Sequence, residues 1–385
     1  MKTAFQLAYK NLMGAGLRTW LNVIVLSFAF VLIIFYNGLI DGWNQQARKD
    51  GIAWEYGYGQ LRHADYDPLD PFTLQDAHGE VPHAPASDLT PILIRQATVY
   101  PQGRMMSVVL KGIEAKQTTL KLPTHLLMES RAEIPAIIGK RMAQSLNIQQ
   151  GEQLLLRWRD KNGTFDAANI TIAGIFDTHV AMVDVGQIWI SVEKLREMTG
   201  LDRQATLYVA GSRFTPHEIP GWHFESQKAL LKELSDIIEM KKISGAIMYG
   251  LLMAIALLAI FDTQVLSIFR RQREIGTYIA MGMTRWQVAL LFTMEGSMYS
   301  LFATVLGALY GIPLLWFMAR EGIGMPAASQ GMGVIIADRI YPVYGFSLIL
   351  GTLVLVVVTA TLVSFLPARK IAKMDPVAAL KGKLQ

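Results

Sequence analysis

The chain has 385 residues, of which 52% are hydrophobic, and its mean hydropathy is +0.29. These values predict membrane spans together with a sizeable water-exposed domain, and they exclude both an ordinary soluble enzyme and a protein lying wholly in lipid. The formal net charge is +5, but the basic excess lies beside apolar stretches, where membrane topology explains it without nucleic-acid binding. The absence of cysteine excludes disulfides, thiolate metal sites and cysteine nucleophiles.

The first apolar stretch, residues 20–40, has the length of a helix that crosses a bilayer. A cleaved signal peptide is the competing interpretation, but the run is too long for the apolar region of such a peptide and lacks a small-x-small cleavage site. We therefore expect residues 1–44 to form a cytoplasmic N-terminus and transmembrane helix 1. Asn22 and Asn37 lie near its two ends, where their amides are expected to meet headgroups or water.

Residues 45–226 are expected to form an α+β domain outside the cytoplasm, because short strand-like and helix-like patterns alternate there. Five prolines make residues 67–91 a loop that cannot be buried in lipid. The patterns predict strands over 52–63, 107–113 and 187–190, the last running into a helix at Ser191, and a short helix over 136–148. Strand-like runs at 153–159 and 164–176 flank Asn162-Gly163, which predicts a hairpin whose two turn residues have positive φ.

The second half of the chain reads as three further spans. Residues 227–269 predict one continuous helix, an amphipathic stalk followed by transmembrane helix 2; a stalk lying on the membrane surface is the alternative. Transmembrane helix 3 covers 288–319, where Pro313 predicts a break. Its Gly307 and Gly311 permit close helix approach, within the chain or at a dimer seam.

Charge gives one orientation for all four spans. A short outer loop at 320–343, transmembrane helix 4 at 344–366 and a tail at 367–385 complete the chain. Lys and Arg number three before the first span, four in the loop at 270–287 and five in the tail, against two in the short outer loop. Positive flanks resist translocation, so both termini are predicted to be cytoplasmic and the large domain to lie outside.

The loop at 270–287 carries Arg270, Arg271, Arg273 and Arg285. Within it Ile275, Tyr278, Ile279 and Gly282 recur at i, i+3, i+4 and i+7, which predicts a short helix whose apolar side fits a groove on another protein. A basic connector that only fixes topology is the simpler alternative.

Two groups of motifs resemble the FtsX/MacB/LolC superfamily of ABC transporter permeases. One runs from Arg273-Glu274-Ile275-Gly276 through Ala280-Met281-Gly282-Met283-Thr284 to Glu295-Gly296; the other comprises Leu366-Pro367-Ala368-Arg369-Lys370 and Asp375-Pro376-Val377-Ala378-Ala379-Leu380. The segment Ala173-Gly174-Ile175-Phe176-Asp177, with Asp184 after it, resembles the lipoprotein-releasing branch.

This resemblance implies a fold and a site. The fold is a membrane protein with four transmembrane α-helices and an α+β extracytoplasmic domain between spans 1 and 2, a MacB-like periplasmic core. The loop at 270–287 is then the coupling helix that docks on the ATPase. The coupling residues so implied are Arg273, Glu274, Ile275, Gly276, Tyr278, Ile279 and Gly282.

It also implies a function, ATP-driven mechanotransmission in the bacterial inner membrane. The branch motif favours release of lipoproteins towards the outer membrane. Expected partners are an ABC ATPase subunit, a second permease copy or paralogue, lipoprotein or other periplasmic cargo, and a periplasmic chaperone or adaptor, for which the Lys161–Gly163 hairpin and Trp158 are candidate contacts. The alternatives are an efflux or peptide-resistance permease and a regulator of a cell-wall hydrolase.

Catalytic chemistry is not expected of this chain. Gly139-Lys140 is followed by Arg141, so it is not a Walker A motif, and ATP and Mg²⁺ are expected in a separate ATPase subunit. The seven histidines show no HExxH or comparable metal spacing. Asp262 and Glu295 are acids inside apolar spans, and two readings are open: a proton or substrate path, or a structural contact with a helix end, an arginine of the loop or a second subunit.

Overall fold

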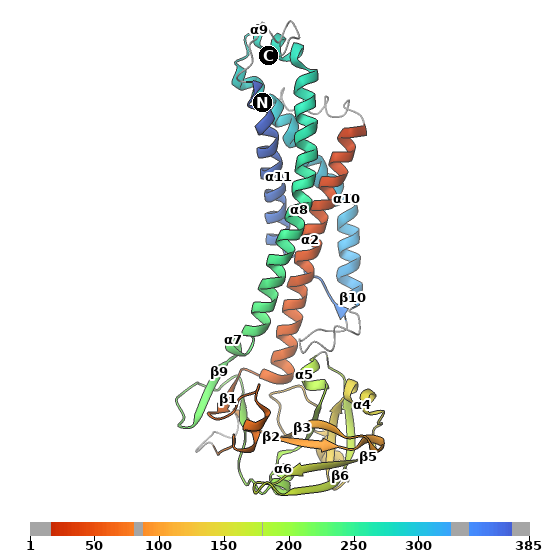
Figure 1. Ribbon diagram of the computed structural model, residues 1–385, viewed down its shortest axis with the longest axis vertical. Coiled ribbons are helices and arrows are strands. Elements are labelled where there is room, and N and C mark those ends of the chain that lie inside the picture. The colour runs from red at the N-terminus through yellow and green to blue at the C-terminus, as the bar shows by residue number, and fades with distance from the viewer. Residues whose placement is uncertain (1–16, 81–87, 179, 325–338, 372–385) are drawn as a thin grey trace. The chain divides into compact units, whose positions relative to one another are not determined.

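The computed structural model describes residues 17–80, 88–178, 180–324 and 339–371. The chain divides into two compact units. One unit comprises residues 1–42, 238–323 and 341–385, and the other comprises residues 43–237 and 324–340. Each unit is built differently, the first from helices and the second around a sheet (Figure 1).

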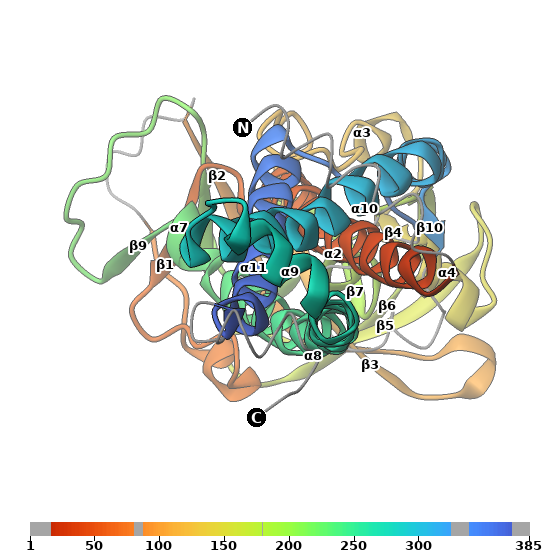
Figure 2. The same cartoon turned by 90° about the horizontal axis from the view of Figure 1, so that it is seen from above.

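Four long helices dominate the first unit: α2 (Leu17–Gly51), α8 (Lys232–Arg270), α10 (Arg285–Glu321) and α11 (Phe346–Ala368). All four are long and apolar enough to cross a membrane. They lie side by side (Figure 2), and one buried cluster takes side chains from each of them, for example Leu26, Ile260, Tyr299 and Val356. The short helix α9 (Gln272–Ala280) stands between α8 and α10.

Three expectations about the helices need correction. Helix α10 runs unbroken through Pro313, because proline removes only one backbone hydrogen bond and the rest of a long helix absorbs that loss. The expected continuous stalk from residue 227 is two helices, since Leu231 (φ −94°, ψ 9°) separates α7 (Gln227–Leu230) from α8. The first helix extends beyond residue 44 to Gly51 and passes into a π-helical turn, η1 (Ile52–Tyr56).

The second unit contains a sheet of nine strands in the order β3-β7-β4-β6-β5-β2-β8-β1-β9. The strands are β1 (Gly59–His63), β2 (Leu89–Val99), β3 (Met106–Ile113), β4 (Pro135–Gly139), β5 (Gln153–Arg159), β6 (Phe165–Phe176), β7 (Gln187–Ser191), β8 (Leu207–Ala210) and β9 (Trp222–Ser226). Strand β2 pairs with both β5 and β3, so the first six strands of the order close into a barrel. Closure leaves these strands without the open edges that promote aggregation.

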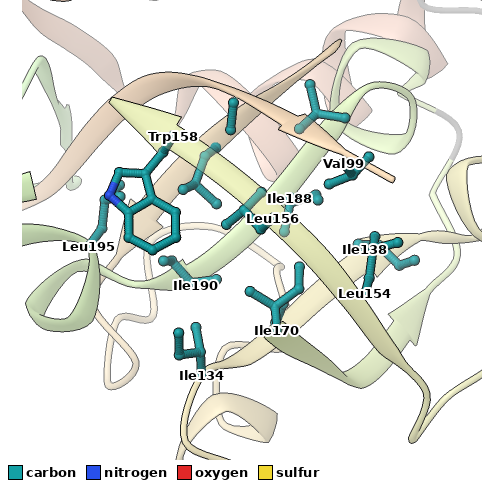
Figure 3. Close-up of a cluster of buried hydrophobic side chains, with 14 of the residues drawn as sticks. Val99, Ile134, Ile138, Leu154, Leu156, Trp158, Ile170, Ile188, Ile190 and Leu195 are labelled. Carbon is teal, nitrogen blue, oxygen red and sulfur yellow. The ribbon is translucent and has the colours of Figure 1, made fainter. Parts of the chain in front are cut away.

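The interior of the barrel is the main core of this unit. Alternate residues of its strands point inward, among them Leu110, Ile138, Leu156, Ile170 and Ile188, all essentially inaccessible to solvent. Figure 3 shows the cluster, with Ile138, Leu156, Ile170 and Ile188 among the labelled side chains. Trp158 belongs to the same core, with 3% of its surface exposed, and its Nε1 donates to the Met198 carbonyl at 2.9 Å.

Short helices complete the unit: α3 (Leu126–Glu129), α4 (Lys140–Leu146), α5 (Ala181–Asp184), α6 (Val192–Thr199) and the 3₁₀ turns η2 (Pro71–Gln75) and η3 (Pro101–Gly103). Met142 of α4 and Leu195 of α6 are buried in the barrel core. Two-residue strands β10 (Ile323–Gly324) and β11 (Arg339–Ile340) flank residues 325–338 in the sequence.

Several local predictions in this unit are confirmed. The strand at 107–113 and the strand-to-helix sequence at Ser191 are present as β3 and as β7 followed by α6. The hairpin around Asn162-Gly163 is present as β5 and β6. Its turn differs from the prediction, because only Gly163 has a positive φ, of 80°. The Asp160 side chain instead closes the turn by accepting from the backbone N–H groups of Asn162 and Thr164 at 2.9 and 2.7 Å.

Other local predictions are wrong. Residues 135–139 form β4 rather than the first turns of a helix, because their apolar side chains fill the barrel between β6 and β7. Only the second half of the expected strand at 52–63 is extended, as β1. Pro91, expected in a loop, lies within β2 opposite Tyr208. Part of the expected proline-rich loop, residues 81–87, lies outside the described residues.

Candidate functional site

The segment between α8 and α10 is a nine-residue helix set between two sharp turns. At its start Arg271 (φ −105°, ψ 23°) interrupts the helical path between α8 and α9. At its end Gly282 has a φ of 96°, a conformation that glycine adopts without strain. Thr284 then starts α10 with a capping box, its hydroxyl accepting from the Gln287 N–H and the Gln287 side chain accepting from the Thr284 N–H. Local sequence therefore sets where α9 begins and ends.

The apolar face of α9 is turned into the chain itself. Ile275 is fully buried in a cluster with Val288 and Phe292 of α10 and Ala368 at the end of α11, and Tyr278 and Ile279 pack against that cluster. The prediction that the apolar side of Ile275, Tyr278, Ile279 and Gly282 fits a groove on another protein is wrong for Ile275, which is buried against its own unit. Such a short helix needs an apolar contact to hold its shape, and α10 supplies it.

Arg271 joins the short helix to α10 by a forked ion pair. Its Nη1 contacts the Glu295 Oε2 and Oε1 at 2.8 and 3.0 Å, and its Nε contacts the Glu274 Oε2 at 2.7 Å. The guanidinium also lies 4.8 Å from the centre of the Phe292 ring. Burial disfavours the charge of Arg271, but the two carboxylates outweigh that effect and raise its pKa above the ordinary value. The site thus holds a fixed positive charge between two helices.

The opposite face of α9 is open to solvent. Arg273, Glu274, Thr277, Ala280 and Met281 are exposed on it. Beyond the turn, Arg285 and Trp286 are exposed as well, the indole to 60%. Basic, small and apolar groups presented together on a preformed helix suit recognition by a protein surface.

The two intramembrane acids have different surroundings. Glu295 is 8% exposed and contacts Arg271, so the expected structural contact with an arginine of the loop is confirmed. Asp262 is exposed on α8, and no hydrogen bond or ion pair of its carboxylate occurs in the part of the chain that the structure describes. A proton or substrate path through Asp262 stays a prediction.

Asn22 and the two helix-packing glycines link the long helices. Asn22 is buried and donates to the Thr263 Oγ1 at 2.6 Å and to the Ala259 carbonyl at 3.2 Å, so the prediction that it meets headgroups or water is wrong. Gly307 and Gly311 face α2: a Cβ on Gly307 would lie 3.0 Å from Phe30, and one on Gly311 2.8 Å from Val31. Of the two contacts left open for this glycine pair, the one inside the chain is present.

Motif spacing does not distinguish Arg271 from the other basic residues of the loop. In the structure it is the partner of the one buried acid in α10. A lone carboxylate in an apolar helix near four arginines was the available signal, but spacing cannot say which arginine it meets.

The structure describes part of the C-terminal motifs and Asp184 of the motif that resembles the lipoprotein-releasing branch. Pro367 and Ala368 are buried at the end of α11, Ala368 beside Ile275, while residues 375–380 lie outside the described residues. In the branch motif, Asp184 is 1% exposed and accepts from the Arg141 N–H at 3.0 Å, close to the start of α4.

Among the residues that the structure describes, no group of three or more His, Asp or Glu side chains is arranged to hold a metal ion. His83 and His179 lie outside this set.

Comparison with known proteins defines the class. Residues 246–376, which carry α9 and its contacts, match the family described as FtsX-like permease C-terminal. These residues are thus similar to permeases of the ABC transporter class, whose members work with ATPase subunits. The four long helices of the described residues have the length and composition of membrane spans. The resemblance to the FtsX/MacB/LolC superfamily is thereby confirmed.

Individual relatives differ in how much they share. The lipoprotein-releasing system transmembrane protein LolC of Haemophilus influenzae is 22% identical over 358 residues, 81% of this chain and 87% of that protein. LolC of Xylella fastidiosa is 21% identical, with 73% of each chain covered. The pyoverdine export ATP-binding/permease protein PvdT of Pseudomonas syringae is 31% identical, over 36% of this chain and 19% of that protein.

A solved structure is also similar in part. The extracellular domain of the noncanonic ABC-type transporter YknZ from Gram-positive bacteria matches 40% of this chain and 83% of its own, at 13% identity. The TM-score of 0.24 is too low to equate the two folds.

Proposed function

We propose that this chain is the permease subunit of an ABC transporter that releases lipoproteins from the inner membrane towards the outer membrane. The observation that carries the proposal is the extent of similarity to LolC of Haemophilus influenzae, which covers 81% of this chain and 87% of that protein. Similarity to PvdT is higher in identity but covers only 36% of this chain. A relation that spans both units supports a shared task better than one confined to a third of the chain.

The coupling step is assigned to the open face of α9. A separate ATPase subunit, which binds ATP and Mg²⁺, docks against Arg273, Thr277 and Ala280. Its movement reaches α10 through the ion pair of Arg271 with Glu295 and through the apolar contact of Ile275 with Phe292. Together the two contacts transmit movement of α9 to α10 in both directions. The ion pair resists separation of the two helices, and the packed side chain resists their closer approach.

The membrane arrangement follows from charge. Both termini and α9 lie in the cytoplasm and the sheet unit in the periplasm, as the Lys and Arg count predicts. Two permease chains, two copies or a copy and a paralogue, assemble with the ATPases. The acyl chains of a lipoprotein lie between the first two spans. Asp262 then faces the second subunit or the cargo path.

Of the two candidate chaperone contacts that the sequence indicated, one is buried. Trp158 is buried in the barrel core and donates its N–H to the Met198 carbonyl, so it offers nothing to a partner. The hairpin tip at Lys161–Gly163 is exposed and stays the candidate contact.

Depletion of the protein in its native host tests the function. Membrane fractionation followed by quantification of acylated lipoproteins is expected to show their accumulation in the inner membrane. A normal distribution between the two membranes would contradict lipoprotein release.

A second candidate is export of a secreted small molecule. It is favoured by the 31% identity to PvdT, which is higher than that to either LolC protein. Under this function, depletion would leave lipoproteins correctly placed and would cause a secreted product to accumulate in the cell.

A further inference from the structure

The outer surface of the barrel in the sheet unit carries a cavity of about 530 Å³. Its floor is two rows of side chains that cross neighbouring strands in register. One row is Ile94 of β2, Lys111 of β3 and Trp189 of β7. The other is Gln96, Val109 and Gln187 of the same strands. Since side chains of alternate residues share a face, both rows point away from the barrel core.

The roof of the cavity is formed by segments at the ends of two long helices. Glu55 and Tyr56 belong to η1, the turn that follows α2. Leu230 and Glu233 belong to α7 and the first turn of α8. One side of the cavity is lined by residues between Tyr66 and Leu74, which belong to the connection after β1. The apolar side chains of Ile92, Leu207 and Leu230 also line it. The cavity therefore lies in the size range of small-molecule sites and is mostly apolar.

Four polar groups that line this cavity have no conventional partner among the described residues. The Glu55 Oε2, the Gln187 Oε1 and the Trp189 Nε1 are buried and make no hydrogen bond. Lys111 is 9% exposed and its ammonium makes no hydrogen bond or ion pair there; it lies 4.9 Å from the centre of the Trp189 ring. Buried polar groups are nearly always paired, so three unpaired buried atoms and a buried lysine around one cavity call for an explanation.

Arg62, the other basic residue that lines the cavity, is already paired. Arg62 contacts the Glu225 Oε2 at 2.9 Å, and its Nε and Nη2 donate to the Gln60 Oε1. Burial lowers the pKa of Lys111, and Glu55 acts in the opposite direction. A buried lysine with no ion pair within 4 Å opposes folding, so its presence calls for a reason other than stability.

We propose that this cavity binds an apolar zwitterion of amino-acid or dipeptide size. Lys111 and the Trp189 N–H supply two donors for a carboxylate, and Glu55 and Gln187 supply two acceptors for an ammonium group. The apolar walls formed by Ile92, Ile94 and Leu207 receive a branched side chain. An anion alone would leave Glu55 without a partner, and a cation alone would leave Lys111 without one.

Occupancy has a structural consequence. The ligand touches the segment that follows α2 and the segment that begins α8, and it joins both to the sheet. Binding therefore fixes the chain at the points where it enters two of the four long helices. This places a small-molecule sensor beside the elements that move in the proposed transport cycle, independently of which cargo is moved.

The test is isothermal titration calorimetry of the full chain in lipid nanodiscs with leucyl-leucine. The unmodified protein is expected to bind this dipeptide. N-acetyl-leucyl-leucine amide, which keeps the side chains but lacks both charges, is expected to bind at least about tenfold more weakly. Lys111→Met and Glu55→Gln are each expected to weaken leucyl-leucine binding by about tenfold or more. Lys194→Met is the matched control, because Lys194 pairs with Glu197 away from the cavity.

Any one of three results would overturn the proposal. The first is the absence of leucyl-leucine binding to the unmodified protein. The second is equal binding of leucyl-leucine by the Lys111→Met variant, and the third is equal binding of the blocked dipeptide by the unmodified protein. Lys111→Met replaces a buried charge by an apolar side chain of similar length, so loss of folding is not expected to obscure the result. A normal lipoprotein distribution on depletion would leave this test unaffected.

Discussion

Arg271 and Glu295 are 24 residues apart in sequence, and the Arg271 Nη1 contacts both carboxylate oxygens of Glu295. The pair connects the residue that precedes α9 to a buried position of α10. Only 18% of the Arg271 side chain and 10% of the Glu295 side chain are exposed. An ion pair so protected resists screening by salt. The short helix is therefore tied to a long helix by charge as well as by packing.

Breaking this pair is expected to destabilise the helical unit. Glu295→Gln keeps the size of the side chain but removes its charge, which leaves Arg271 with Glu274 alone. The expected loss is about 3 kcal/mol in the free energy of unfolding, because removing one partner of a protected pair strands the other. Denaturant titration of the detergent-solubilised protein measures it. Glu274→Gln is the control, since Glu274 is exposed, and it is expected to cost at most about 1 kcal/mol.

The same two variants separate stability from coupling. In the complex that co-purifies with its ATPase, Glu295→Gln is expected to reduce transport more than ATP hydrolysis. Glu274→Gln is expected to change both little. Equal loss of transport in the two variants would contradict a specific role for the Glu295 contact.

The bond between Asn22 and Thr263 is expected to be a direct link between α2 and α8. A double-mutant cycle with Asn22→Ala and Thr263→Ala should give a coupling energy of about 0.6 kcal/mol, the size typical of interhelical hydrogen bonds in membranes. Asn37→Ala combined with Thr263→Ala is the control, because Asn37 donates to the Ile33 carbonyl of its own helix. A coupling of zero for Asn22 with Thr263 would mean that the bond does not form.

Close approach of α10 to α2 depends on Gly311. Gly311→Leu is expected to destabilise the protein by about 1–3 kcal/mol relative to Gly351→Leu, because the new side chain meets Val31, whereas Gly351 faces open space. Both changes replace glycine within a helix, so their intrinsic helix propensities cancel. Thermal unfolding in detergent measures the difference. Equal melting temperatures would show that α2 and α10 are not in contact at this point.

Lys111 is expected to make stability depend on pH. Burial lowers its pKa from the ordinary value of 10.5, while the neighbouring charges of Glu55 and Arg62 act in opposite directions. Glu225, Glu233, Asp67, Tyr56 and Tyr66 also line the cavity. Above pH 10.5 Lys111 is neutral in both states. As the pH falls towards the lowered folded value, the unfolded chain takes up the proton first, so the folded state loses stability.

The variant Lys111→Met lacks this penalty. It is expected to be more stable than the unmodified protein at pH 7, with a gain that shrinks as the pH rises to 10.5. Urea unfolding across this range measures the trend, with Lys194→Met as the control that shows none. A gain that grows with pH would contradict the assignment.

Much of the helical unit could be predicted from sequence, because long apolar runs and basic flanks are local signals. The path of α10 through Pro313 could not, since whether a proline breaks a helix depends on its surroundings. Nor could the orientation of α9. A periodic set such as Ile275, Tyr278 and Ile279 shows that a face is apolar, but not whether the chain itself or a partner covers it.

The sheet unit was less predictable for a physical reason. The sequence of strand β4 predicts a helix, because its apolar residues do not alternate with polar ones. A strand that is buried on both faces lacks this alternation. Barrel closure depends on pairing β2 with both β3 and β5, contacts that span up to about 60 residues and leave no local mark. The alignment of Lys111 with Trp189 depends on another long-range pairing, that of β3 with β7.

The central claim is that the open face of α9 docks on an ATPase. Photo-crosslinking from position 277, where Thr277 is exposed, tests it most directly, with position 275 as the buried control. The account predicts a crosslink from position 277 in native membranes to a protein with a nucleotide-binding domain, and none from position 275. A crosslink to that protein from position 275 alone, or only to periplasmic proteins from position 277, would contradict it.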